Sequence, residues 1–283
     1  MSHPHPSTPG PHNTHLFRPL STPLQAPDSP SVIAKVVGRD PRVRIVRSTE
    51  RLGLQGAWRE AFHRAVGFVC EETGEAPRYF AWTSDHDVWN CDWLRTLVPI
   101  LERHRSAVLA HSWVETIDES GRMQPGPIPI FETEQQHSVP HRIVHSIRAM
   151  NGAGNAVYGL FRVEALTQCG VFREVLMPDR LLLTELALEG RVIQHPQVLW
   201  LRRATGTFSL RRQRARLFRE GGRPWSTLLP WWIVHGAILG RELHRGGATW
   251  PASIGVSIRF GIVQGLKSCK QTLLGLLRKA PRR

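Results

Sequence analysis

Two aspartates separated by one residue form the sharpest candidate for chemistry in this sequence. Asp85-His86-Asp87 follows directly after residues 78–83, an apolar run that predicts a buried strand. Carboxylates held this close repel each other unless a cation or a hydrogen-bond network compensates their charge. A hard divalent ion that bridges carboxylate and diphosphate oxygens would supply that compensation. The triplet is therefore a candidate metal and diphosphate site, although most isolated triplets of this kind are surface turns or helix caps.

Other patterns of catalytic residues are missing from the sequence. There is no Gly-x-Ser-x-Gly elbow of a serine hydrolase, no phosphate-binding P-loop and no GxGxxG fingerprint. The four cysteines are far apart and form no CxxC pair, which excludes a disulfide framework and a cysteine zinc site and favours a reducing cytosol. The sequence has no apolar run of eighteen residues and no secretory signal at its start.

The elements that must position the triplet alternate between strands and helices. Strands are predicted at residues 42–46, 78–83, 107–117, 155–162 and 198–203, and helices at 57–66, 93–101, 140–150, 163–169 and 179–189. This alternation predicts an α/β fold, Rossmann-like, with a mostly parallel sheet flanked by helices. Since ligands of open α/β sheets bind beyond the carboxyl ends of the strands, residues 85–87 stand at a favoured position.

Composition divides the chain into three parts. Residues 1–31 are rich in proline and predict a disordered tail, residues 32–205 carry the α/β pattern, and residues 206–283 form a basic, tryptophan-rich helical extension. The net charge of +14 arises after residue 200, where 17 Lys and Arg stand against two glutamates. This asymmetry points to a polyanionic partner: a membrane surface, a nucleic acid or a phosphorylated ligand.

Several segments, in order, resemble the pattern of glycosyltransferase family 2. Arg42–Val46, Leu52–Gly56 and the helix that follows are similar to that family's strand, glycine loop and helix. Residues 79–89 (YFAWTSDHDVW) resemble its strand and metal-binding Asp-x-Asp. The later matches are Ile117–Gly121 with its hairpin, Tyr158–Arg162 with its acceptor-side strand, and Asp179–Gly190 with the helix that bears its catalytic base.

This resemblance implies a hexosyltransferase-type enzyme with the GT-A fold that uses a nucleotide-sugar donor and inverts the sugar carbon. Asp87 would ligate Mg²⁺ or Mn²⁺ on the diphosphate, Asp85 would lie near the metal or the donor ribose, and Gly53 would belong to the donor loop. Asp179 would be the general base that deprotonates the acceptor hydroxyl. The alternative for Asp179 is a first-turn carboxylate that only stabilises the dipole of its helix.

Three further residues are candidates for the acceptor side. Gly159 and Arg162 belong to the strand that resembles the family's acceptor strand, and the indole of Trp89 could stack on a sugar ring. The glycine-bearing stretch 151–155 could approach an acceptor or a phosphate, or simply form a turn. The expected acceptor is a hydroxyl of a glycan, of a lipid-linked sugar or of another molecule.

The sequence also departs from the family pattern. Family members usually place a strand, a helix and a strand before the segment matching Arg42–Val46, whereas here a proline-rich tail and one predicted helix precede it. Leu52 replaces the usual Asn, and Arg202-Arg203 stands where many members carry a metal-binding histidine. An N-terminally truncated domain is therefore expected. The alternative function is a non-catalytic scaffold or membrane-surface binding module with a degenerate donor site.

The basic extension indicates where the protein works. Residues 225–239 are strongly apolar, and residues 266–277 repeat leucines among cations, a composition that suits an anionic membrane surface. The alternative is a helical appendage that packs its tryptophans on the α/β domain. No recognition motif supports nucleic-acid binding. The expected location is cytoplasmic, with a peripheral position at the inner face of the membrane.

Overall fold

The computed structural model describes residues 40, 42–46, 48, 50, 52–150, 153–204, 217–218 and 224–279, with side chains described up to residue 270. The predicted tail at 1–31, the predicted helix before Arg42 and most of the arginine-rich stretch 211–219 lie outside these residues. The strands are β1 (Tyr79–Phe80), β2 (Val88–Trp89), β3 (Ala107–Ile117), β4 (Met123–Gln124), β5 (Leu160–Arg162) and β6 (Arg191–Arg203). The helices are α2 (Gly53–Thr73), α3 (Trp93–Arg103), α4 (Val139–Ala149), α5 (Val163–Gln168), α6 (Pro178–Glu189), α8 (Trp231–Arg245) and α9 (Trp250–Lys279), with 3₁₀ turns η1 (Ala153–Tyr158) and η2 (Trp225–Leu228).

The α/β class is confirmed, but the prediction of a mostly parallel sheet is wrong. The strands follow the order β1-β5-β3-β6-β2, with β4 beside the end of β3. Among the described pairings only β3 and β6 run parallel, and the other four are antiparallel. A parallel pair needs a crossover of a dozen residues or more, whereas the turn at residues 118–122 is short enough only for an antiparallel return into β4.

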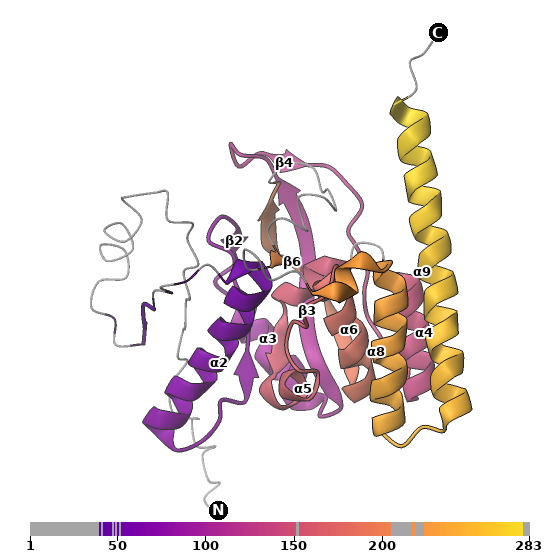
Figure 1. The fold of residues 1–283 in the computed structure, drawn as a ribbon. Helices are drawn as coiled ribbons and strands as arrows, with labels where there is room; N and C mark the ends of the chain where they lie inside the picture. Colours follow the sequence, from indigo (N-terminus) through magenta and orange to yellow (C-terminus); the bar gives the residue numbers. More distant parts are fainter. Residues whose placement is uncertain are drawn as a thin grey trace, which may run out of the picture.

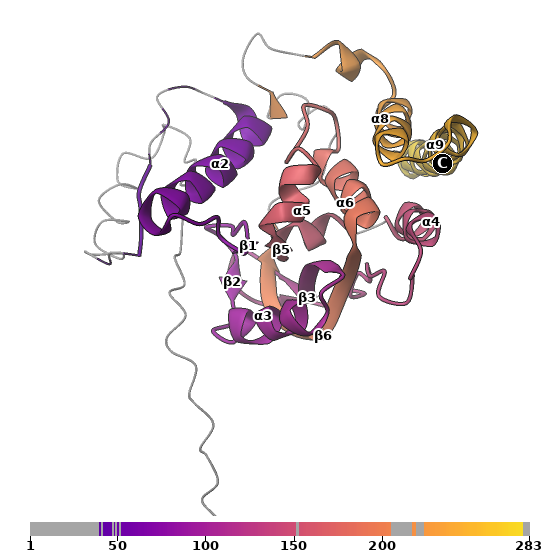
Figure 2. The ribbon, with the colours of Figure 1, turned by 90° about the horizontal axis from the view of Figure 1, so that it is seen from below.

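Two apolar layers hold the central strands β3 and β6, and Figure 2 shows α3 on one face of the sheet with α5 and α6 on the other. Toward α3, Leu97 and Leu101 pack with Ala110 and Leu160. On the opposite face, the larger cluster is built from α2, α5, α6 and the sheet, and its members include Phe62, Phe161, Leu166, Leu182 and Leu186. Alternation along β5 sends Leu160 to one layer and Phe161 to the other, as expected for a strand buried on both faces.

Several predicted elements have different limits in the structure. The helices near 93–101, 140–150, 163–169 and 179–189 are confirmed, as is the strand at 107–117. The strand predicted at 78–83 contains only two paired residues, and the one predicted at 155–162 is a 3₁₀ turn followed by three strand residues. The last strand begins at Arg191, seven residues before the predicted position. Short edge strands depend on a tertiary neighbour, which sequence alternation does not reveal.

Residues 42–46 form no strand, which corrects a prediction that the family resemblance used. Val43 and Ile45 are half-buried and exposed, respectively, and no described strand pairs with them. The hydrogen bonds here are local and not between strands: the Arg42 backbone N–H and guanidinium donate to the Asp40 carboxylate. The glycine loop predicted at residues 53–56 is instead the first turn of α2.

The basic extension folds in its described part as two helices, α8 and α9, which lie side by side at one flank of the molecule (Figure 1). A third apolar cluster fixes them there, joining Ile143 of α4 and Leu181 of α6 to Leu239 of α8 and Phe260 of α9. Within the described residues, no helix combines the length and the apolar character needed to cross a bilayer. The division of the chain at residues 31 and 205 stays a prediction.

Candidate functional site

Residues from three elements meet at one edge of the sheet, where β3 and β6 end. The parallel register sets Thr116 opposite Arg202 and Ile117 opposite Arg203, so both strands deliver their carboxyl ends to the same place. Strand β2 then pairs antiparallel with the end of β6, with Val88 opposite Leu201. This pairing brings the Asp85–Asp87 triplet to the carboxyl edge, where ligands of such sheets bind.

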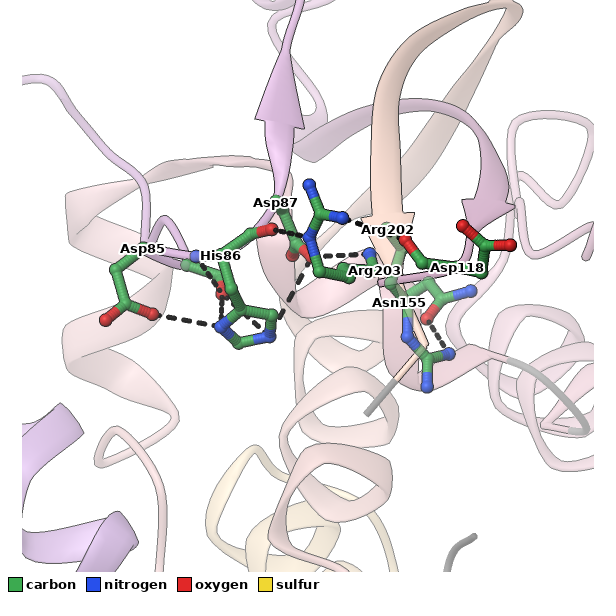
Figure 3. Close-up of polar contacts among 8 residues, drawn as sticks. Asp85, His86, Asp87, Asp118, Asn155, Arg202 and Arg203 are labelled. Carbon is green, nitrogen blue, oxygen red and sulfur yellow. Dashed lines mark hydrogen bonds and ion pairs between the residues drawn. The ribbon is translucent and has the colours of Figure 1, made fainter. Parts of the chain in front are cut away.

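The Asp87 carboxylate is buried at this edge, with its side chain 2% exposed. The backbone N–H of Arg203 donates to Asp87 Oδ1 at 2.8 Å, as drawn in Figure 3. The ring nitrogen Nε2 of His86 lies 3.8 Å from the same oxygen. Asp87 is therefore a fixed acceptor whose position is set by the last residue of β6.

Asp85 lies on the outer side of the triplet and is far more accessible, at 61% exposure. Its Oδ1 contacts His86 Nδ1 at 2.9 Å, and the Ser84 hydroxyl contacts the same imidazole at 2.7 Å. The imidazole thus lies between the two carboxylates (Figure 3). The Ser84 hydroxyl and the His86 imidazole therefore form the kind of hydrogen-bond network that two close carboxylates need.

Arg203 connects the triplet to the turn that follows β3. Its guanidinium donates to the backbone carbonyls of His86, Asp118 and Glu119, each within 2.9 Å. These bonds join the ends of β2, β3 and β6 through a single side chain. Sequence reasoning noted Arg203 only as a replacement for a histidine, and a signal for its role was its place at the end of the last predicted strand.

A pocket of about 840 Å³ opens beside these turns. It is lined by the ends of β3 and β6, by the proline-rich segment at 123–129 and by the start of α6. Its polar groups come from Asp179 and Arg180 of α6, Asn155 of η1, Arg202 of β6, Glu115 and Thr116 of β3, and Gln124 of β4. Arg202 Nη1 donates to Asn155 Oδ1 at 3.2 Å, which spans the wall of the pocket. The triplet carboxylates are not among the residues that line this cavity.

Asp179 lies in the first turn of α6, after Met177, whose φ is 55°; the residue is half-buried, and its Oδ1 atom is shielded from solvent. Its Oδ1 has no hydrogen-bond partner among the described residues, and its Oδ2 is so close to Gly154 that an added Cβ there would lie 2.6 Å away. Burial raises the pKa of this carboxyl, and the Arg180 charge offsets part of that rise. An unpaired oxygen costs free energy in the folded state, so its persistence marks a position available to a ligand.

Tyr158 lies close enough to the triplet aspartates and to Asp179 for their charges to affect its phenol. Burial raises the pKa of its phenol to about 12, and the charges of Asp87, Asp179 and Asp85 add to the rise. Its ring packs against Trp200 at 4.8 Å, and Trp200 stacks on Trp89 at 5.2 Å. The sequence analysis did not single out Tyr158 or Asn155 as site residues, although both belong to a segment that it placed near the acceptor.

The remaining predicted site residues lie in different parts of the fold. Arg162 donates to the carbonyls of Ala107 and Leu101, at the start of β3 and therefore at the end of the sheet away from the pocket. Gly159 packs against Leu109 and Ala110 so closely that a Cβ would overlap them. Gly53 has a φ of +68° and lies against the backbone of Leu217. The structure does not bring these three residues to the triplet.

A comparison with protein families matches a stretch of the chain that includes the triplet. The model of glycosyl transferase family 2 matches residues 26–158, which is just under half of the chain. Over this stretch the chain is similar to glycosyltransferase family 2. That stretch contains the triplet, β3 and Tyr158, while Asp179, Arg202 and Arg203 follow it. No curated relative matches the chain.

Family 2 proteins typically use a divalent metal, which needs oxygen ligands from the protein. No group of three or more His, Cys, Asp or Glu residues able to hold a metal occurs among the described residues. Magnesium sites built on substrate phosphates need only one or two carboxylates from the protein, with hard oxygen donors. Asp87 Oδ1 is the hard oxygen donor that such a site would use, and Asp85 lies on the other side of the His86 imidazole.

Proposed function

We propose that this protein transfers a sugar from a nucleotide diphosphate donor to an acceptor hydroxyl, with inversion at the sugar carbon. The observation that carries the proposal is the buried, unpartnered Oδ1 of Asp179, which belongs to a carboxylate in a pocket beside the family-matched triplet. Loss of a hydrogen-bond partner in a buried carboxylate is costly, and an acceptor hydroxyl would provide one. A first-turn carboxylate that only stabilised its helix would have no need of a pocket.

In this proposal the pocket residue Asp179 acts on the acceptor, and the Asp85–Asp87 triplet acts on the donor. Asp179 accepts the proton of the acceptor hydroxyl while that oxygen forms its bond to the sugar carbon and the bond to the diphosphate oxygen breaks. Burial, which raises the pKa of Asp179, makes it a better base than an exposed aspartate. Arg180 and Arg202, which also line the pocket, contribute positive charge near the developing negative charge of the leaving group.

The triplet serves the donor diphosphate. Asp87, with Asp85 beside it, would hold Mg²⁺ or Mn²⁺, which supplies charge neutralisation to the departing diphosphate. Arg203 keeps Asp87 in place through its backbone N–H, and its guanidinium fixes the turns on either side. Trp200 is buried between Tyr158 and Trp89, and the partly exposed ring of Trp89 would be the surface on which the sugar or base packs.

A transfer assay tests the proposal. The full chain is incubated with a panel of nucleotide sugars and Mn²⁺, and release of the nucleoside diphosphate is followed with and without a chelator. We expect release with at least one donor and its loss when the metal is removed. A folded protein that releases no nucleoside diphosphate from any donor contradicts the enzymatic proposal and favours the alternative, a non-catalytic scaffold with a degenerate donor site.

A further inference from the structure

Large apolar side chains are exposed very unevenly over the described residues. Fourteen large hydrophobic residues are exposed, and nine of them lie between Trp225 and Leu266, in the described part of the extension. Five of these nine recur at every fourth position of α9: Trp250, Ile254, Ile258, Ile262 and Leu266, each between 51% and 68% exposed. We call these five residues the α9 ridge.

The α9 ridge faces away from the rest of the molecule. The packed side of α9 carries Phe260 and Gln264, and Gln264 Nε2 donates to the Ile147 carbonyl of α4 at 2.6 Å. At 3.6 residues per turn, the midpoint of the ridge lies on the side of the helix opposite these residues. Gly236 and Gly240 of α8 let the two helices approach closely at Ser257, so α8 covers the packed side. The ridge is therefore a helix face that the described residues leave uncovered.

The charges around the α9 ridge are almost all positive. Arg259 and Lys270 are exposed on α9, and Arg241 and Arg245 are exposed on α8. Glu242 is the single acidic residue between positions 224 and 270, and it is occupied by Arg173, Arg241 and Arg245. An apolar face bordered by cations is the composition of a helix that lies in the plane of an anionic membrane.

The dimensions argue against a second copy of the chain as the occupant. From Trp250 to Leu266 the ridge is about 24 Å long, and a helix with its side chains is about 10 Å wide. The resulting area of about 240 Å² is well below the roughly 800 Å² that each partner contributes to a stable protein interface.

We propose that the α9 ridge docks the protein on an anionic phospholipid surface, with Trp250, Ile254, Ile258, Ile262 and Leu266 inserted at the lipid headgroup level. Arg259 and Lys270 then lie beside the phosphates. Arg180 of the pocket packs over Trp231 at the start of α8, which connects the pocket to the helix pair. The inference rests on the helices alone and does not depend on sugar transfer.

Vesicle flotation of the full chain tests this docking. The protein is mixed with vesicles of phosphatidylcholine and with vesicles that also contain phosphatidylglycerol, and the bound fraction is measured. We expect binding to the anionic vesicles and its loss in the variant Ile258→Ser with Ile262→Ser. The matched control is Ile45→Ser with Ile130→Ser, which makes the same two changes at exposed isoleucines of the α/β part. Circular dichroism and thermal unfolding verify that each variant is folded.

A charge variant separates the two contributions to docking. Arg259→Gln with Lys270→Gln is expected to weaken partitioning to anionic vesicles about thirtyfold, since each cation near the lipid contributes about 1 kcal/mol and 1.4 kcal/mol corresponds to tenfold. Its control, Arg64→Gln with Arg95→Gln, removes the same charge from α2 and α3 and should bind like the wild type. Three outcomes overturn the proposal: no vesicle binding by the wild type, equal binding by the ridge variant, or a self-association that the ridge variant abolishes while vesicles bind neither protein.

Discussion

Helix α6 carries two carboxylates whose surroundings differ. Glu185 is buried, Asp179 in the first turn is half-buried with a buried Oδ1, and desolvation raises the pKa of both. Glu185 accepts a bond from Arg173 Nε at 2.6 Å, and Arg173 continues to Glu242 of α8, so this carboxylate links two helices. Asp179 Oδ1 has no such partner and belongs to a pocket-lining residue.

This difference distinguishes a candidate catalytic carboxylate from a carboxylate in a structural ion pair. A raised pKa alone does not distinguish the two residues, because burial produces it at both ends of the helix. The unpaired oxygen beside a cavity does. Glu185 is therefore interpreted as a structural residue that holds α8 against the domain, and Asp179 as the residue that meets the acceptor.

Asp179→Asn gives the largest expected effect. Turnover should fall by about 10²–10⁴-fold, the range that a positioned general base contributes. Stability should change little, because the amide loses the attraction of the Arg180 charge but also removes a carboxylate charge that is costly to desolvate. Turnover is followed by release of the nucleoside diphosphate and stability by thermal unfolding. A variant that keeps the wild-type rate would show that Asp179 is no base.

Gly154→Ala tests the same carboxylate by crowding its other oxygen, Oδ2. The new methyl group would lie 2.6 Å from Asp179 Oδ2, so the carboxylate must move. A displacement near 1 Å can cost about a hundredfold in rate, and we expect a fall of about ten- to a hundredfold. The control is Gly126→Ala, a pocket-lining glycine with open space around it. Equal rates for both variants would remove Gly154 from the description of the site.

Glu185→Gln gives the smallest effect on turnover; it weakens the ion pair with Arg173, so it should lower stability and change the pH dependence of stability. The pKa of Glu185 is raised from 4.5 to about 7, so the folded state binds its proton more tightly than the unfolded state does. The free energy of unfolding should therefore decrease as the pH rises from about 4.5 to about 7, by about 1.4 kcal/mol for each unit of separation.

Denaturant unfolding across that pH range should show the decrease in the wild type and a flatter profile in Glu185→Gln. Glu71→Gln, at an exposed position on α2, serves as the control and should follow the wild type. If Glu185→Gln reproduces the wild-type profile, the raised pKa belongs to another group. Turnover at a fixed pH should be unchanged, in contrast to Asp179→Asn.

The sequence predicted the parts of this molecule that depend on local pattern. Strand 107–117 and the helix at 179–189 were found because their apolar periodicity is long, and the triplet because two carboxylates follow an apolar run. The sheet direction was missed because edge strands of two or three residues take their orientation from their neighbours. The roles of Arg203 and Tyr158 were missed because residues far apart in the chain define them.

The most direct test of the account is a calorimetric titration with nucleoside diphosphates, with and without Mn²⁺. The titration is made on the wild type, on Asp87→Ala and on Asp179→Asn. The account assigns the donor diphosphate to Asp87 and the acceptor proton to Asp179. It predicts metal-dependent binding by the wild type and by Asp179→Asn, and loss of that binding in Asp87→Ala. Binding that is equally strong in Asp87→Ala, or no nucleotide binding by the folded wild type, would contradict it.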